Sequence, residues 1–213
     1  MVCLSKVNKM KTSETVKQIK RSFRLFMNGV TANSMRQKGL DYKVNWGVSQ
    51  VDLRRMAQTY GKDKALAEAL WTENTRECKL LATLVMPPAE MTRDEAVAWA
   101  ESAASVETAE AVVFNLFQHL GSAAQLAGIM LVSKRPLTRL AAYNLVCRLL
   151  KRGSLLDDSQ WTQLFESAAA DLSSADRQLL HALVNCLDYV AATDGEYAEK
   201  AKKLLIDAGF EAF

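Results

Sequence analysis

The stretch TRECKLLA at residues 75–82 decides the fold, because three later stretches resemble it. These are TAEAVVFNL at 108–116, TRLAAYNL at 138–145 and DRQLLHALVN at 176–185. Their starts lie 33, 30 and 38 residues apart, and a helix–turn–helix unit that recurs at such intervals is typical of an α-solenoid. Each hairpin has an apolar face that it cannot bury alone, so stacked neighbours would form the core. The alternative is an irregular helical bundle.

The composition agrees with an all-α fold. Of the 213 residues, 49% are hydrophobic and 24% are charged, which is enough apolar material for a sizeable core and too much for a disordered chain. Nine glycines and three prolines are too few for the frequent turns of a β-sandwich or barrel. No stretch approaches the roughly 20 apolar residues of a membrane span.

Apolar spacing, capping residues and stop signals predict about eleven helices joined by short links. The expected ranges are 12–27, 49–60, 62–71, 75–86, 95–103, 107–120, 122–132, 136–151, 157–172, 173–192 and 194–208. Residues 28–47, which contain three glycines, are expected to be irregular. Thr92 and Glu95 form a capping-box pattern. We divide the chain into a basic N-terminal helix or arm, 1–30, and one repeat domain, 31–213.

The net charge of +3 hides an asymmetry. Residues 1–60 carry 12 Lys or Arg and 3 Asp or Glu, which leaves a balance of −6 on the remainder. A basic first quarter on a mildly acidic body suggests a contact with a polyanion. Nucleic acid, an acidic membrane surface and a solvated arm without a partner all fit this pattern.

The cysteines and the first residues indicate the compartment. Lys6, Lys9, Lys11 and Lys17 interrupt the first 20 residues, so we expect no secretory signal. The four cysteines at positions 3, 78, 147 and 186 are far apart and lack zinc-ligand spacing. Three of them fall in apolar helical patterns, where cysteine behaves as a small buried hydrophobe. We therefore expect a reducing, cytoplasmic location.

The chemistry-bearing residues exclude several classes of site. His119 and His181 lie within predicted helices without a Ser or Cys motif, so nucleophilic catalysis is unsupported. No glycine-rich phosphate loop is present, and we expect no metal and no cofactor. Glu107 and Glu110 share one helix face, although complementation of the helix dipole explains acids near a helix start equally well. A second basic cluster, which a solvated surface also explains, comprises Arg135, Arg139, Arg148, Lys151 and Arg152.

Several motifs resemble those of the DNA alkylation repair family. Gly47-Val48-Ser49 followed by Leu53-Arg54-Arg55-Met56-Ala57 resembles the start of the family's first repeat, and the stretch 69–82, ALWTENTRECKLLA, resembles its Leu-Trp…Arg-Glu…Ala repeat. Arg139-Leu140-Ala141-Ala142 resembles a later Arg-Ala-Ala helix. The family contains HEAT-like-repeat alkylpurine DNA glycosylases of the AlkD type. The resemblance covers roughly residues 30 to 205 and implies a curved right-handed superhelix of HEAT-like hairpins with a concave groove.

The resemblance also implies an activity and its site. Family members bind duplex DNA along a positively charged concave face and release N3- or N7-alkylated purines. The position of the acid that stabilises the developing sugar cation falls on Glu110, where the family has Asp, and that of the phosphate-holding arginine falls on Arg139. Two cleft tryptophans correspond to Val106 and to the vicinity of Asn185, and a basic position falls near Asp188. The longer acid and the missing tryptophans imply weak or altered activity.

Further cations are expected to contact the DNA backbone. In the first repeat these are Arg36, Lys38 and Lys43, and weaker candidates are Arg76, Lys79, Arg135 and Arg148. We expect a monomer that binds double-stranded DNA, alkylated or structurally unusual, and does not bind membranes. Two other functions remain open: a non-catalytic relative that binds DNA through the same face, and a helical scaffold that holds another protein.

Overall fold

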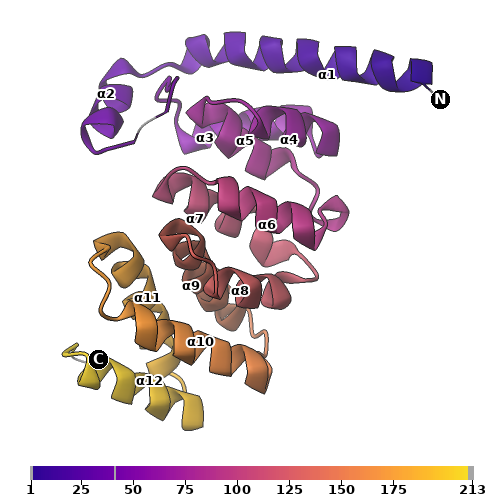
Figure 1. The fold of residues 1–213 in the computed structure, drawn as a ribbon. Coiled ribbons are helices and arrows are strands. Elements are labelled where there is room, and N and C mark those ends of the chain that lie inside the picture. Colours follow the sequence, from indigo (N-terminus) through magenta and orange to yellow (C-terminus); the bar gives the residue numbers. More distant parts are fainter. Residues whose placement is uncertain (1, 41, 211–213) are drawn as a thin grey trace. The chain divides into compact units, whose positions relative to one another are not determined.

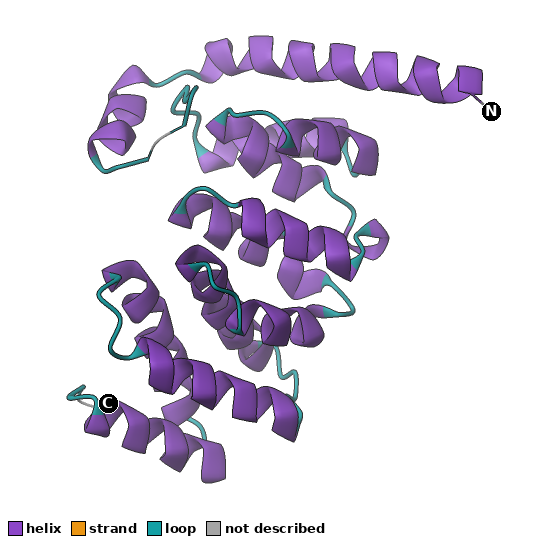
Figure 2. Cartoon of the chain, in the orientation of Figure 1, coloured by secondary structure: helices purple, strands orange, loops and turns teal. Residues whose placement is uncertain are grey.

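The computed structural model describes the backbone of residues 2–40 and 42–210 and the side chains of residues 10–40 and 42–210. Within these ranges helices are the only regular structure apart from one isolated bridge between Val44 and Thr75, as Figure 2 shows. The all-α prediction is therefore confirmed for the described part of the chain. The α-helices and 3-10 turns are α1 (Val2–Ser22), η1 (Phe23–Phe26), α2 (Gly29–Gln37), α3 (Gln50–Tyr60), α4 (Lys64–Trp71), α5 (Arg76–Val85), η2 (Pro88–Glu90), α6 (Arg93–Ser102), α7 (Val106–Asn115), η3 (Phe117–His119), α8 (Ala123–Leu131), α9 (Pro136–Lys151), α10 (Asp158–Asp171), α11 (Arg177–Ala191) and α12 (Glu196–Asp207).

Helix starts follow the capping residues. Thr92 and Glu95 make the expected capping box: the Thr92 hydroxyl accepts from the Glu95 N–H at 3.2 Å, and the Glu95 carboxylate accepts from the Thr92 N–H at 2.8 Å. Asn28 caps α2 by accepting from the Thr31 N–H at 3.0 Å, so a helix occupies part of the segment that was expected to be irregular. The first helix begins at Val2 instead of near residue 12. None of the helices of the described residues is both long and apolar enough to cross a bilayer.

The chain divides into two compact units, residues 1–91 and 92–213. The division does not coincide with the predicted arm boundary after residue 30. In the first unit α1 packs on α4, and α5 packs on α3 and α4 (Figure 1). Ile19 and Phe23 are fully buried, so residues 2–26 are joined to the repeat helices through an apolar contact and not only through charge.

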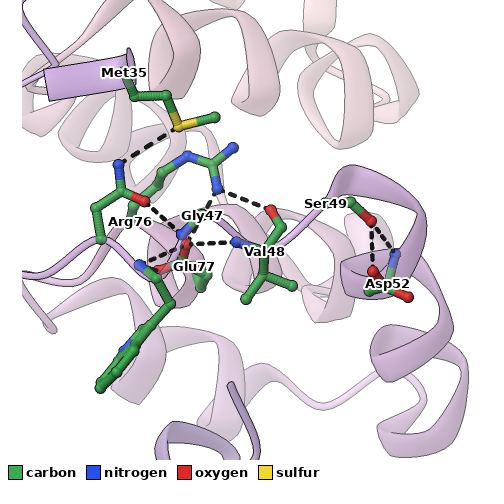
Figure 3. A network of polar contacts seen from close by, with 9 residues as sticks. Met35, Gly47, Val48, Ser49, Asp52, Arg76 and Glu77 are labelled. Atoms are coloured by element: carbon green, nitrogen blue, oxygen red, sulfur yellow. Dashed lines mark hydrogen bonds and ion pairs between the residues drawn. The ribbon is translucent and has the colours of Figure 1, made fainter. Parts of the chain in front are cut away.

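A buried ion pair holds the loop that precedes α3 (Figure 3). The Glu77 carboxylate accepts from the Trp46 N–H at 3.2 Å and from the Val48 N–H at 3.3 Å. The Arg76 guanidinium donates to Glu77 at 3.1 Å and to the Val48 carbonyl at 3.0 Å. Both side chains are nearly inaccessible to solvent, at 2% and 0% exposed. This network connects α5 to loop 43–49. It gives a structural reason for the adjacent Arg76 and Glu77 in the first repeat.

Gly47 allows that loop to approach the start of α2. Its backbone has a φ of +68°, and a Cβ at this position would lie 2.2 Å from the Asn28 carbonyl oxygen. Since both the positive φ and the close approach exclude a side chain, glycine is required here. The Asn28 N–H donates to the Trp46 carbonyl at 2.8 Å, so residues 28 and 46 are held together.

The second unit is a stack of helical hairpins. α6 with α7, α8 with α9 and α10 with α11 form successive pairs, and α12 covers α11. Figure 1 shows α6, α8 and α10 in one layer and α7, α9 and α11 in another, and contacts within each layer join α6 to α8, α8 to α10, α7 to α9 and α9 to α11. The similar stretches at 108–116, 138–145 and 176–185 fall in α7, α9 and α11, so the sequence repeat marks one layer of the stack. Tyr143 of α9 is fully buried between the layers.

Candidate nucleic-acid interface

Cations and aromatic rings alternate over the layer formed by α7, α9 and α11. The Arg148 guanidinium carbon of α9 lies 4.5 Å from the ring centroid of Phe114 on α7. The Lys151 ammonium lies 5.0 Å from the ring centroid of Tyr189 on α11. Arg148, Lys151 and Phe114 are exposed, so both cations remain accessible while the rings restrict their orientation. The residues that make up this α7–α9–α11 face are Glu110, Phe114, Asn144, Arg148, Lys151, His181, Asn185, Asp188 and Tyr189.

A cavity of about 560 Å³ opens on this face between α9 and α11. It is lined by Asn144, Cys147, Arg148, Lys151, Asn185, Asp188, Tyr189 and Ala192. The side-chain amide nitrogen of Asn144 is buried and has no hydrogen-bond partner among the described residues. An unsatisfied buried donor is costly to the folded state.

Glu110 lies beside the cations and not in the core. It is exposed, and Phe114 follows it by one turn of α7. Removal of water around the carboxyl group raises the pKa of Glu110, Glu107 raises it further, and His181 of α11 partly offsets both. His181 is oriented by Asn185, whose amide nitrogen lies 3.2 Å from the imidazole Nδ1. The face therefore presents a carboxylate between α7 and α11, with cations one turn away.

Arg139 does not join Glu110. Its Nε donates to Asp171 at 2.9 Å and its Nη1 donates to the Ser133 carbonyl at 2.8 Å. Asp171, which ends α10, also accepts from the Tyr143 hydroxyl at 2.9 Å. Burial raises the pKa of Tyr143, and the Asp171 carboxylate adds to the shift, so the hydroxyl stays a donor. This network directs Arg139 toward α10, so its phosphate-holding role stays a prediction, whereas the Arg148 guanidinium of the same helix is exposed on the α7–α9–α11 face.

We expect the substitution Arg139→Met to affect folding much more than binding. Asp171 is 9% exposed, and removal of its charged partner leaves a nearly buried carboxylate without a cation, which costs about 2–3 kcal/mol. Urea denaturation measures that loss, and a titration with duplex DNA below the unfolding transition should stay within about twofold of the unaltered chain. A tenfold loss of DNA affinity with unchanged stability would instead assign Arg139 to phosphate binding.

Of the other side chains predicted to contact the DNA backbone, some are exposed and others are held by contacts within the protein. Arg36, Lys38 and Lys43 of the first unit are exposed, as is Arg148 of the second. Arg76 is 2% exposed and bonded to Glu77, so its side chain offers almost no surface for the DNA contact that was predicted. Lys79 donates to the Trp71 carbonyl and lies 4.6 Å from the Trp71 ring centroid, which occupies its ammonium group.

Arg135 lies at the start of α9 and is half-buried. Its guanidinium donates to the Ala103 carbonyl at 3.0 Å, which joins the end of α6 to α9. Part of its fork remains available, so Arg135 stays a weaker candidate for a backbone contact.

Sequence reasoning missed part of the face. Phe114 lies four residues after Glu110, and Tyr189 lies four residues after Asn185; both supply aromatic rings to this face. The positions that correspond to the family's cleft tryptophans hold Val106 and Asn185 instead. Lys151 belonged to the predicted basic cluster but was not assigned to DNA. Helical spacing of four residues would have placed both rings on the same face as the polar positions.

The remaining chemistry is limited. Cys78 and Cys186 are buried and Cys147 is half-buried, each as a free thiol, whereas the Cys3 side chain lies outside the described residues. Burial raises the pKa of the Cys78 thiol to about 12, so this thiol stays protonated and unreactive. No cluster of three or more His, Cys, Asp or Glu that could hold a metal ion occurs in the described part of the chain.

Comparisons with known proteins agree on the family and the fold. A family model described as "DNA alkylation repair enzyme" matches residues 10–201. A solved structure from a study of "a new family of proteins related to the HEAT-like repeat DNA glycosylases with affinity for branched DNA structures" is similar to this chain, with a TM-score of 0.77 and 18% identity over 91% of this chain and 83% of the other. No curated protein sequence matches. The HEAT-like fold expected from the sequence is thus confirmed.

Proposed function

Because the chain belongs to the DNA alkylation repair family, we propose that it binds DNA along the α7–α9–α11 face, with Glu110 as the carboxylate that promotes release of N3- or N7-alkylated purines. One observation supports this most strongly. Arg148 stacks on Phe114, the residue one helical turn after Glu110, so a phosphate-binding cation and a carboxylate share one short surface.

In this proposal, Arg148 and Lys151 provide the affinity for DNA. Arg148 and Lys151 are exposed and belong to the same helix, and neutralisation of phosphates by such side chains releases counterions from DNA. Tyr189 and Phe114 hold the cations over flat rings, which limits the conformational freedom that binding would otherwise remove. A sugar or base edge could lie against the same rings.

In this proposal, the Glu110 carboxylate promotes cleavage of the bond between the alkylated purine and its sugar. Cleavage of the bond between an alkylated purine and its sugar develops positive charge on the sugar, which a nearby carboxylate stabilises. Glu110 can do so only when it is deprotonated. Its longer side chain and its lack of a hydrogen-bond partner among the described residues favour slow release, because an unrestrained carboxylate is poorly positioned.

We expect the double substitution Arg148→Ala/Lys151→Ala to weaken duplex binding on the order of tenfold at 0.1 M salt. The slope of log affinity against log salt should become shallower by about 2, since each lost phosphate contact removes about 0.9. Fluorescence anisotropy with a labelled duplex measures both quantities. The matched control is Lys200→Ala/Lys203→Ala on α12, which removes the same charge from another helix and should change the slope little. Equal effects of the two double variants would refute the assignment of the face.

A second candidate function is DNA binding without base release. It is favoured by the exposed Glu110 and by Val106, which is only half-buried and supplies no aromatic wall. It predicts salt-dependent binding with no free base detected by chromatography from methylated duplex. Failure to bind any DNA at low salt would favour instead a scaffold that holds a protein.

A further inference from the structure

The cavity between α9 and α11 brings together groups that can recognise a nucleotide. Its volume of about 560 Å³ is typical of sites that enclose small ligands. The cations Arg148 and Lys151 lie on one wall, and Asn144 lies on the same helix. Asp188 and the ring of Tyr189 lie on the opposite wall, which α11 provides. Positive charge, an aromatic ring, an amide and a carboxylate thus line one opening.

Two polar side chains of this cavity have hydrogen-bonding capacity to spare. The Asn144 amide nitrogen is buried and has no acceptor within the part of the chain that the structure describes. Asp188 takes part in none of the ion pairs of residues 10–40 and 42–210. Removal of water around its carboxyl group raises the pKa of Asp188. The two cations of the opposite wall are held over aromatic rings, so the cavity offers one free donor and one free carboxylate to a ligand.

A purine base fits this combination of groups. A carboxylate accepts hydrogen bonds from the exocyclic amino group of a base, and a side-chain amide donates to a ring nitrogen or a carbonyl oxygen. A purine alkylated at N3 or N7 also carries a positive charge, which makes its amino group a stronger donor to a carboxylate. The interaction is stronger where water is partly excluded, as it is around Asp188.

The cavity adjoins the proposed catalytic carboxylate. Asn185 lines the cavity on α11, and its amide nitrogen lies 3.2 Å from the imidazole Nδ1 of His181, one helical turn earlier. His181 is in turn close enough to Glu110 of α7 to offset part of the rise in the pKa of that carboxyl group. The sugar of a nucleotide whose base occupied the cavity would therefore lie on the side of Glu110.

We propose that the alkylated purine leaves the base stack and enters the cavity between α9 and α11, where Asp188 accepts from its amino group and Asn144 donates to its edge. Arg148 and Lys151 hold the neighbouring phosphates, and Glu110 faces the sugar. Eversion of a base is least costly when the base is damaged, so an undamaged purine stays stacked. This inference rests on the proposed function and adds the residues that select the base.

The proposal gives a role to an acid that is out of place as a phosphate contact. The family resemblance places a basic residue near position 188, where this chain has Asp188. A carboxylate repels phosphates, but it is the side-chain group that accepts from the amino group of a base. The competing interpretation is that Asp188 only weakens DNA binding by repulsion, and the test below separates the two.

The test uses the full chain and a pair of duplexes that differ at a single nucleotide. One duplex contains guanosine at that position, and the other contains 2′-fluoro-N7-methylguanosine, whose fluorine slows cleavage so that binding is measured apart from base release. 2-Aminopurine beside this nucleotide reports its unstacking through fluorescence. Anisotropy of an end label gives the affinity for each duplex.

Each variant has a matched control. Asp188→Asn removes the carboxylate, and Asp207→Asn removes the same charge from an exposed position on α12. Ala192→Phe fills the cavity without changing a polar group, and Ala169→Phe adds the same ring at an exposed position on α10. Circular dichroism melting verifies that each variant folds.

We expect the unaltered chain to bind the methylated duplex on the order of tenfold more tightly than the undamaged one. It should also raise 2-aminopurine fluorescence on the methylated duplex alone. Asp188→Asn and Ala192→Phe should lose both the preference and the fluorescence increase, whereas their controls retain them. Binding of undamaged duplex by Asp188→Asn should match that by Asp207→Asn.

A preference that survives both Asp188→Asn and Ala192→Phe overturns the inference, as does an equal fluorescence increase on the two duplexes. Tighter binding of both duplexes by Asp188→Asn, by the same factor and with the preference retained, would show that this carboxylate only repels phosphate. Each of these results leaves the proposed DNA binding and the role of Glu110 in place. Failure of the unaltered chain to bind either duplex defeats the proposed function as well.

Discussion

The variant Glu110→Gln is expected to release alkylated purines at least a hundredfold more slowly than the unaltered chain. The amide keeps the size of the side chain but has no charge with which to stabilise a sugar cation, and loss of one such electrostatic contact costs about 10²–10³ in rate. Release of N7-methylguanine from a methylated duplex, measured by chromatography under single-turnover conditions, gives the rate. DNA affinity should fall by no more than twofold.

The pH dependence of purine release provides an independent test of the role of Glu110. Since the pKa of Glu110 is raised, release should fall with decreasing pH through a value above the ordinary glutamate pKa of about 4.3. Glu107→Gln is the matched control: it removes a repelling carboxylate, so it should move the acid limb of the profile to lower pH and retain activity. Unchanged release by Glu110→Gln would show that this residue is not the catalytic acid.

The substitution Glu77→Ala is expected to lower the free energy of unfolding of the first unit by about 3–5 kcal/mol. It removes the Glu77 carboxylate from the buried Arg76 guanidinium and deprives the Trp46 and Val48 N–H groups of their acceptor. Urea denaturation combined with amide hydrogen exchange in α3–α5 measures the loss in this unit.

A surface ion pair serves as the control for that change. Glu73 accepts from Lys20 at 2.6 Å but is 31% exposed, and such pairs contribute at most about 1 kcal/mol. Glu73→Ala should therefore be far milder than Glu77→Ala. A loss below 1 kcal/mol for Glu77→Ala would mean that loop 43–49 is held by other contacts.

The helical repeat could be predicted because each hairpin must bury apolar side chains at equivalent positions. The stretches at 75–82, 108–116, 138–145 and 176–185 share apolar residues at the positions that pack between neighbouring hairpins, and all four fall in α5, α7, α9 or α11. Local capping signals such as Thr92 with Glu95 were equally informative, because they depend on residues three apart. Asn28 carried the same kind of signal for α2 within a glycine-containing segment.

The site could be predicted only in part, because the direction of a polar side chain depends on its partners. Arg139 and Arg148 lie on one helix and look alike in sequence, but Asp171, 32 residues after Arg139, draws Arg139 toward α10. Arg76 is similarly taken up by the adjacent Glu77 and by the Val48 carbonyl, 28 residues earlier. Nothing local in the sequence marks Asp171 or the Val48 carbonyl as a partner. Phe114 and Tyr189 were missed for the opposite reason, since helical spacing alone would have placed them.

Site-specific photo-crosslinking tests the central claim most directly. A photoreactive phenylalanine analogue replaces Tyr189 on the α7–α9–α11 face or, as the comparison, Glu166, which is exposed on α10 in the other layer. With labelled duplex or junction DNA at low salt, we predict a strong protein–DNA crosslink from position 189 and little or none from position 166. A crosslink from position 166 without one from position 189 would contradict the account, because DNA would then lie against the opposite layer of the second unit.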